Sequence, residues 1–371
     1  MARRISLARR NLFQDRRRAA LSIVGVAAAL LLVLVLEGIF AGAMQQVTAY
    51  VRNSPADVFV AQQGARTMHM TQTALDPSTV ESVAAVDGVA WAEGLRYTTS
   101  ILGAGDSQRT TYVFGYDVSG GRGGPSSFSA GAAPKRREIV VDDVAAAELG
   151  VGLGDTVSVL GVEFRVSGLS TEGTNIVNTT VYIRTEDFAD LRGDSIAFVL
   201  TGAQPGIDPQ LLVERIEAAV PGVTAQTRAE FVRQEKTVVR DMTADVMRIM
   251  TVIAFLIALV VVGLTLFTTT LAKLREYGVV KALGAGPTRL AIVVATQSAW
   301  VVVFGLAVAT ATAWATGIAL EAATPNIQVS VQLASVLRTG LSAFLAGALA
   351  TALPLRRVQR VDPATSFRRP L

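Results

Sequence analysis

The sequence predicts an α-helical membrane protein with four transmembrane helices and one large mixed α/β extracytoplasmic domain between the first and second helices. Of the 371 residues, 51% are hydrophobic and only 17% are charged, which is too apolar for an ordinary soluble protein. Four stretches reach the roughly 20 apolar residues that a helix needs to cross a bilayer. Residues 46–240 carry 16 Lys and Arg against 23 Asp and Glu, whereas the whole chain has a net charge of +4. The basic excess therefore lies beside the apolar stretches, which indicates membrane orientation and not a nucleic-acid partner.

Several classes of site are excluded by the residues that the chain lacks. It has no Cys, and His69 is its only His, which excludes disulfides, Cys nucleophiles, His-based triads and HExxH zinc sites. No Gly-Lys pair occurs, so there is no P-loop. The run SGGRGGPSS (119–127) lacks the strand–turn–helix context of a phosphate loop and is interpreted as a flexible loop. We expect no catalytic residue, no metal site and no resident cofactor.

The predicted transmembrane helices cover residues 19–45, the apolar part of 227–273, residues 290–320 and residues 332–355. The first is interrupted only by Glu37, and its apolar core is too long for a cleaved signal peptide. The third is long enough to tilt or to extend beyond the bilayer. An external loop, 321–331, joins the third and fourth helices.

Basic residues gather at the N-terminus, in the loop between the second and third helices, and in the tail 356–371. Lys and Arg are enriched in cytoplasmic loops, so these three segments are expected to be cytoplasmic. Residues 46–226 then lie outside, and the four helices alternate in direction without conflict. The basic residues are Arg3, Arg4, Arg9, Arg10, Arg16, Arg17 and Arg18, then Lys273, Arg275, Lys281 and Arg289, then Arg356, Arg357, Arg360, Arg368 and Arg369.

The N-terminal segment 1–18 has two interpretations. Ile5, Leu12 and either Leu7 or Ala8 fall near one face of a possible helix and basic residues occupy the rest, which is typical of an interfacial helix in contact with lipid headgroups. The alternative is a disordered basic tail. The spacing of the apolar residues, close to 3.6, favours the helix.

The extracytoplasmic domain is predicted to contain short strands and helices. Asp76-Pro77 and Asp208-Pro209 each place an N-cap before a Pro at the first helical position. The Gly-, Ser- and Pro-rich stretch 122–137 is predicted to be loop. Strands are expected near residues 57–60, 97–102, 110–115, 138–141, 180–183 and 197–201, with a hairpin of 156–160 and 163–166 and a short helix at 144–149.

Two segments of this domain resemble each other: VESVAAVDGV (80–89) and VERIEAAVPGV (213–223). Both read as a helix followed by Gly and a strand. The similarity predicts a split βαβ layout with a β-rich insertion, although helix–Gly–strand is a common pattern and coincidence is the alternative.

A long helix is predicted to lead from this domain into the second transmembrane helix. Thr227 and Glu230 form a capping-box pattern, and no Pro or Gly follows between Thr227 and Val262. Segment 227–273 therefore predicts a rigid stalk continuous with the transmembrane helix, about 70 Å long at 1.5 Å per residue.

The cytoplasmic segment 274–289, within LREYGVVKALGAGPTRL (274–290), has a polar surface and a backbone break at Gly284–Pro287. It resembles the loop of MacB/FtsX-type ABC permeases that precedes the third helix, where the pattern is R-E-[IY]-G-[IV]-x-[KR]-A-[LI]-G-A. In that family this loop couples to a groove of the ATPase. The resemblance assigns that role to Arg275, Glu276, Lys281, Leu283, Gly284 and Ala285.

The resemblance extends over nearly the whole chain, through RRNLFQDRRRAALS (9–22), residues 140–169, TRAEF (227–231) and LRRVQRVDPATSFR (355–368). It implies a bacterial inner or plasma membrane, a MacB-like periplasmic core domain over 46–226, and a homodimer working with two ATPase subunits. Because this chain has no nucleotide-binding domain, the ATPase is expected to be a separate polypeptide. Membrane lipids are the other expected partner.

The candidate substrate site combines an intramembrane acid with methionines. Glu37 lies in the outer third of the first helix, where an ionised carboxylate is costly and functional roles are common. Met44 follows two turns later on the same face, and Met242 and Met247, with Met250, lie at the outer start of the second helix. Alternatively, Glu37 reaches the outer interface or pairs with Arg338, and the methionines only pack.

The region 37–64 and the cluster Met68-His69-Met70 resemble HrtB-type haem exporters and DevC-like permeases, which makes haem one candidate substrate. Thioether and carboxylate groups can both bind iron. His69 could be a metal contact, but a plain surface residue is the favoured interpretation. Efflux is the predicted function. The alternative is an FtsX-like transmission subunit that activates an extracytoplasmic partner such as a cell-wall hydrolase.

Overall fold

The computed structural model describes residues 16–68, 73–171, 173–174, 178–272, 286–324 and 327–360. The chain forms two compact units. We call Ala43–Thr243, with Thr324–Ile327, the α/β domain, and we call the remainder the helical unit. Both main boundaries fall inside continuous helices, since α2 covers Arg16–Val47 and α8 covers Arg228–Ala272. The predicted interfacial segment 1–18 lies almost entirely outside the described residues.

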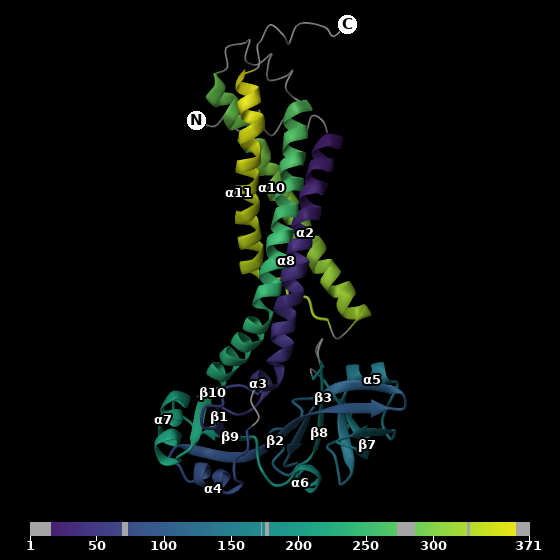
Figure 1. Cartoon of the computed structure of the whole chain (residues 1–371), viewed down its shortest axis with the longest axis vertical. Coiled ribbons are helices and arrows are strands. Elements are labelled where there is room, and N and C mark those ends of the chain that lie inside the picture. The colour runs from purple at the N-terminus through teal and green to yellow at the C-terminus, as the bar shows by residue number, and fades with distance from the viewer. Residues whose placement is uncertain are drawn as a thin grey trace. The chain divides into compact units, whose positions relative to one another are not determined.

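The helical unit consists of most of α2, the apolar part of α8, α10 (Pro287–Ala323) and α11 (Leu333–Arg360) (Figure 1). Three described helices contain stretches long and apolar enough to cross a membrane, at Ala19–Val47, Arg248–Thr265 and Ala295–Ala323. Among the residues of α11 whose side chains are described, the apolar stretch is Leu333–Ala348, and it contains Arg338. The predicted count of four transmembrane helices is therefore not confirmed by length and composition.

Small residues allow α2 and α10 to approach closely within the helical unit. Val26 and Leu30 of α2 share a buried cluster with Ala309 and Ala313 of α10. A Cβ placed on Gly305 would lie 2.7 Å from Cγ1 of Val26, so only Gly fits this crossing. Close packing through small residues is the usual way in which helices associate where no water is available to drive burial.

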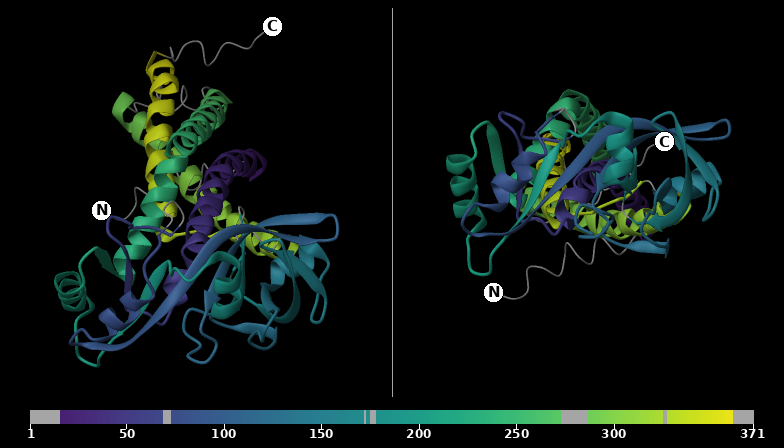
Figure 2. Two further views of the ribbon diagram at one scale, coloured as in Figure 1. Left: turned by 60° about the horizontal axis from the view of Figure 1, so that its bottom comes forward. Right: turned by 90° about the horizontal axis from the view of Figure 1, so that it is seen from below.

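The α/β domain is built on a ten-stranded sheet with the order β10-β1-β9-β2-β3-β8-β5-β7-β4, and β6 pairs with β2 and β7. The strand β2 pairs with β9 over one half of its length and with β3 over the other, and Figures 1 and 2 show it as a long strand that continues from one part of the sheet into the other. The strands are β1 (Val58–Gln62), β2 (Val89–Ala104), β3 (Ser107–Tyr116), β4 (Phe128–Gly131), β5 (Glu138–Asp142), β6 (Thr156–Val159), β7 (Val162–Ser170), β8 (Thr179–Arg184), β9 (Phe198–Ala203) and β10 (Val223–Thr227).

One half of this domain is the predicted split βαβ arrangement. The order along the chain is β1, α4 (Ser78–Ala84), β2, then β9, α7 (Pro209–Ala219) and β10. In space the strands run β10-β1-β9-β2, each antiparallel to its neighbour. The strands β3 to β8 form the insertion between the two halves, which confirms that prediction from the internal repeat.

The Asp208-Pro209 helix start and the capping box are confirmed. A helix also begins beside Asp76-Pro77, but α4 starts at Ser78 with Pro77 as its N-cap, and Asp76 Oδ1 accepts a hydrogen bond from the Ser78 N–H at 2.9 Å. Asp208 Oδ1 accepts a hydrogen bond from the Gln210 N–H at 2.9 Å, which caps α7. The Thr227 hydroxyl accepts from the Glu230 N–H, and the Glu230 carboxylate accepts from the Thr227 N–H, both at 3.2 Å. These reciprocal bonds begin α8, which has 45 residues and is therefore about 68 Å long.

The predictions for the insertion are wrong at one segment and incomplete at another. The stretch 122–137 was predicted to be entirely loop, but it contains β4, which pairs with β7 through a register shift. Backbone pairing to a distant strand overrides the local preference of Gly and Ser for turns. The helix α6 (Thr185–Arg192) was not predicted and follows β8 directly.

A buried carboxylate organises the insertion. Asp142, at the end of β5, is 0% exposed and caps α5 (Asp143–Leu149) by accepting from the Val144 N–H. It also accepts hydrogen bonds from the Gly173 N–H at 2.7 Å and from the Thr174 hydroxyl. Burial outweighs these bonds and raises the pKa of Asp142. This side chain joins β5, α5 and the start of the connection between β7 and β8.

Candidate functional sites

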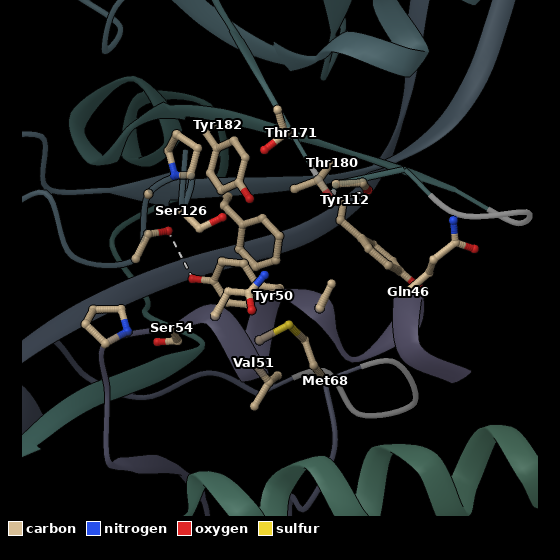
Figure 3. A pocket seen from close by; sticks show the side chains of 18 of the residues that line it. Gln46, Tyr50, Val51, Ser54, Met68, Tyr112, Ser126, Thr171, Thr180 and Tyr182 are labelled. Atoms are coloured by element: carbon tan, nitrogen blue, oxygen red, sulfur yellow. Dashed lines mark hydrogen bonds between the residues drawn. The ribbon is translucent and has the colours of Figure 1, made fainter. Parts of the chain in front are cut away.

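The α/β domain contains a pocket of about 290 Å³ that we call the aromatic pocket (Figure 3). Its walls come from residues 46–55 at the end of α2 and in α3 (Ala49–Asn53), from β3, from the glycine-rich loop after β3, and from β8 and the residues before it. Met68 contributes from a further segment. No charged side chain lines the pocket among the described residues.

Three stacked rings form one side of the aromatic pocket. The ring centroids of Tyr50 and Phe114 lie 4.2 Å apart with an interplanar angle of 11°, and those of Phe114 and Tyr182 lie 5.6 Å apart. Tyr50 comes from α3, Phe114 from β3 and Tyr182 from β8, so the stack joins three segments that are distant in sequence. Offset stacking of this kind adds about 1 kcal/mol beyond area burial.

The phenol groups of the stack are neutral hydrogen-bonding groups. The Tyr50 hydroxyl donates to the Gly123 carbonyl oxygen at 3.0 Å, drawn as the dashed line in Figure 3. Burial raises the pKa of Tyr50 and of Tyr182, so both phenols stay protonated at neutral pH. Figure 3 shows the Tyr182 hydroxyl directed among the other labelled side chains, and no described residue accepts or donates a hydrogen bond there.

The glycine-rich loop is held against the sheet as a wall of the pocket. The Arg122 guanidinium lies 4.3 Å from the ring centroid of Trp91 and its Nη1 atom is 3.0 Å from Glu93 Oε1. A Cβ on Gly124 would lie 2.5 Å from Cε2 of Tyr116, which explains why Gly occupies this close approach. The composition of residues 119–127 predicts a loop, but it gives no sign that this loop lines a pocket.

In the helical unit, Glu37 Oε2 lies 2.8 Å from Arg338 Nη2 and the two side chains form an ion pair. This pairing is the predicted alternative to a substrate-binding role for Glu37. The Glu37 side chain is 17% exposed and the Arg338 side chain 66% exposed. The pair borders a cavity of about 110 Å³ lined mostly by apolar side chains. The buried Thr339 hydroxyl in its wall has no partner among the described residues.

The predicted methionine set is not gathered within one compact unit. Glu37 belongs to the helical unit, whereas Met44, half-buried near the end of α2, belongs to the α/β domain. Met242 and Met247 lie on α8, but their side chains are not among those described; Met250 is 47% exposed.

The Met68-His69-Met70 cluster lies only partly within the described residues, because His69 and Met70 fall outside them. Met68 is buried at 4% exposure in the α/β core, and its N–H donates to the Glu235 carboxylate. Across the described part of the chain no group of three or more His, Asp or Glu residues is placed to hold a metal ion. The coupling residues Arg275, Glu276, Lys281, Leu283, Gly284 and Ala285 also lie outside it.

Comparison with known families gives two matches along the chain. Residues 19–219 match the MacB-like periplasmic core domain, and residues 248–363 match the FtsX-like permease C-terminal domain. Residues 220–247, which hold β10 and the first part of α8, lie between the two matched ranges.

Similar whole proteins are also known. An uncharacterized ABC transporter permease of Mycobacterium tuberculosis is 27% identical over 364 residues, covering 96% of this chain and 97% of that protein. One of Mycobacterium bovis is 27% identical over 354 residues, covering 95% and 96%.

Among solved structures, the periplasmic region of MacB from Actinobacillus actinomycetemcomitans matches with a TM-score of 0.37 and 13% identity, covering 50% of this chain and 94% of that one. The extracellular domain of the ABC-type transporter YknZ from Gram-positive bacteria matches with a TM-score of 0.37 and 10% identity, covering 46% and 100%.

Proposed function

The chain belongs to the MacB/FtsX-type ABC transporter permeases, and from this membership we propose that it is the membrane subunit of an ATP-driven efflux system. Permeases of this kind are membrane proteins that work with an ATPase subunit and are generally not enzymes themselves. The proposed cargo is an amphipathic or hydrophobic molecule, with haem as one candidate. The proposed ATPase is a separate polypeptide that docks on residues 274–289.

The observation that carries this proposal is the continuity of α8. Its first turn is fixed in the α/β domain by the capping box and by Phe231, which is 1% exposed and stacks on Phe59 with centroids 4.9 Å apart. Its last residue, Ala272, lies two residues before the proposed docking segment. A helix without a break transmits displacement along its axis, so ATP-driven movement at the docking segment would reach the α/β domain.

We propose a homodimer for the working complex. Within Arg248–Thr265 of α8 none of the described side chains is buried in a single chain, and Ile253, Leu256 and Val260 are among the exposed ones. We propose that lipid covers one face of this exposed part of α8 and that α8 of a second copy of the chain packs against another face. Glu37, Met44, Met242 and Met247 remain the proposed contacts for substrate, in which case they would be assembled in the dimer.

The proposed topology places residues 1–18, 274–289 and 356–371 in the cytoplasm and residues 46–226 and 321–331 outside. The chain has no Cys, so single-Cys variants can be labelled cleanly. A membrane-impermeant maleimide applied to intact cells is expected to modify Ser129→Cys and not Thr288→Cys, both at exposed positions. Equal labelling of the two sites would contradict this topology.

The proposed function is tested by breaking α8. Arg240→Pro removes a helical hydrogen bond and clashes with the preceding turn, whereas Arg240→Ala preserves the helix. Each tagged chain is isolated with its ATPase, and ATP-dependent haem accumulation is measured in inverted vesicles. We expect Arg240→Pro to retain the ATPase and hydrolysis but lose most accumulation, while Arg240→Ala behaves as the unmodified chain. Equal accumulation in both variants, or a chain that never recruits an ATPase, would refute the proposal.

The alternative, a transmission subunit acting on an extracytoplasmic partner, is favoured by one observation. Ile101, Phe128 and Leu153 are exposed apolar side chains on the insertion of the α/β domain, and an extracytoplasmic partner bound there would cover them. Wild-type vesicles that hydrolyse ATP without accumulating haem or any amphipathic compound, together with loss of cell-wall hydrolase activity in cells carrying Phe128→Ser, would support this alternative.

A further inference from the structure

We propose that the aromatic pocket is a binding site for an uncharged ring compound that carries a hydrogen-bond acceptor. This site lies in the α/β domain, and none of its lining residues is among the substrate contacts proposed above. The inference does not depend on the export function, since it concerns binding to residues of one compact unit.

The size and lining of the pocket define the class of ligand. A volume of about 290 Å³ is at the lower limit of small-molecule sites, which suits one or two rings and not a macrocycle. Tyr50, Phe114 and Tyr182, together with Tyr112 and Met68, make the lining largely apolar and aromatic. A ligand with ionised carboxylates, such as haem, would find no opposite charge among the described lining residues.

The hydrogen-bonding groups of the pocket define the polar part of the ligand. Tyr182 is only 5% exposed, and its neutral hydroxyl has no hydrogen-bond partner among the described residues. The Thr180 hydroxyl already donates to the Gly173 carbonyl oxygen at 2.8 Å, and the Tyr50 hydroxyl donates to Gly123. The Tyr182 hydroxyl is therefore a donor available in the pocket, and a carbonyl or ether oxygen on the ligand would accept from it.

The pocket also adjoins the end of a long helix. The Thr48 hydroxyl donates to the Met44 carbonyl oxygen at 3.0 Å, and Arg52 Nη2 donates to the Gln45 carbonyl oxygen at 3.3 Å. These bonds tie α3, and with it the Tyr50 ring, to the last turn of α2. A ligand stacked on Tyr50 would thus contact the junction through which α2 enters the α/β domain.

Benzophenone is a suitable probe because it is an uncharged two-ring ketone and forms covalent adducts with nearby C–H groups under near-ultraviolet light. The full chain in detergent is irradiated over a range of benzophenone concentrations, and adducts are mapped by peptide mass spectrometry. We expect saturable labelling of residues 46–55 and 112–126, above a non-saturable background on apolar helices. The same experiment with 4-benzoylbenzoate, which has the same rings and a negative charge, is expected to give much weaker saturable labelling.

Matched variants test the site. Ser126→Trp fills the pocket from the loop, whereas Ser129→Trp adds the same side chain at an exposed position of β4 outside the lining. Saturable labelling should vanish in the first and persist in the second. Tyr182→Phe keeps the ring and should weaken binding about fivefold, the value of one net hydrogen bond near 1 kcal/mol. Thermal melting of each variant verifies folding. Labelling without a saturable component, or equal labelling of the two Trp variants, would overturn the proposal.

Discussion

The α/β domain and the helical unit differ in the size of the side chains that they bury. The α/β domain encloses large rings, with Phe59, Phe164 and Phe198 each at most 1% exposed. In the helical unit Ala309 and Ala313 are fully buried, while Leu333 and Trp314 are 74% and 66% exposed. The α/β domain therefore buries its large apolar side chains within itself, whereas the exposed apolar side chains of the helical unit are suited to contact with lipid. Deleting a large side chain should damage the first, and adding one at a close crossing should damage the second.

The largest expected effect comes from one substitution made at two positions of α8. Phe231 is buried in the α/β domain and Phe255 is 40% exposed in the helical unit. Phe231→Ala is expected to lower the free energy of unfolding by about 4 kcal/mol because it leaves a cavity. Phe255→Ala should change it by less than about 1 kcal/mol, since half-exposed side chains lose little burial. Chemical denaturation of the purified chain measures both, and equal losses would remove the distinction between the regions.

A polar change in the α/β domain should rank next. Asp142→Ala leaves the donors Gly173 N–H, Thr174 Oγ1 and Val144 N–H without their acceptor, which should cost roughly 3 kcal/mol. Unfolding by denaturant at neutral pH measures this loss. An unchanged midpoint would mean that other groups satisfy these donors.

The same carboxyl predicts a pH dependence. Burial raises the folded-state pKa of Asp142 above its unfolded value, so its contribution to stability is largest below the unfolded pKa and is lost as pH rises through the folded pKa. Compared with Asp142→Asn, the unmodified chain should gain stability as the pH falls from neutral toward about 4. Denaturation at a series of pH values tests the sign. A relative loss on acidification would show that the hydrogen bonds outweigh burial.

In the helical unit the sensitive change is an enlargement. Gly305→Leu would force α10 away from Val26 on α2 and should cost about 2 kcal/mol. Ala315→Leu, at an exposed position of the same helix, is the matched control and should be neutral. Thermal unfolding followed by helical circular dichroism compares them. If both variants melted alike, the close crossing would not contribute to stability.

The smallest effect is expected for the ion pair of Glu37 and Arg338. With the Arg338 side chain 66% exposed, a double-mutant cycle with Glu37→Gln and Arg338→Gln should give a coupling energy below about 1 kcal/mol. A coupling of several kcal/mol would mean that the pair is shielded in the assembled protein. That result would mean that the helical unit also contains a buried polar interaction, as the α/β domain does at Asp142.

Local sequence patterns were sufficient for the elements that begin with a local signal. Asp208-Pro209, the Thr227–Glu230 capping box and the 156–166 hairpin each rely on residues within a few positions of one another, and all three are present. The strand β4 was missed because its pairing partner, β7, lies far along the chain and its own residues favour turns.

The aromatic pocket could not be predicted for the same reason. Its rings Tyr50, Phe114 and Tyr182 come from three separate segments, and no periodicity relates them. The pairing of Glu37 with Arg338 was foreseen as an alternative because both lie at similar depth in their helices. The methionine site rested only on spacing along separate helices, which does not determine which side chains meet.

The strand β2 limits how this protein can vary in length. Its residues 89–95 pair with β9 and its residues 96–104 pair with β3, and side chains alternate between faces along a strand. One inserted residue in the middle would turn Leu102 away from the core while leaving Leu95 in place, or the reverse. Insertions and deletions in members of this family are therefore expected at the hairpin tip, Gly105 and Asp106, and not within β2 itself.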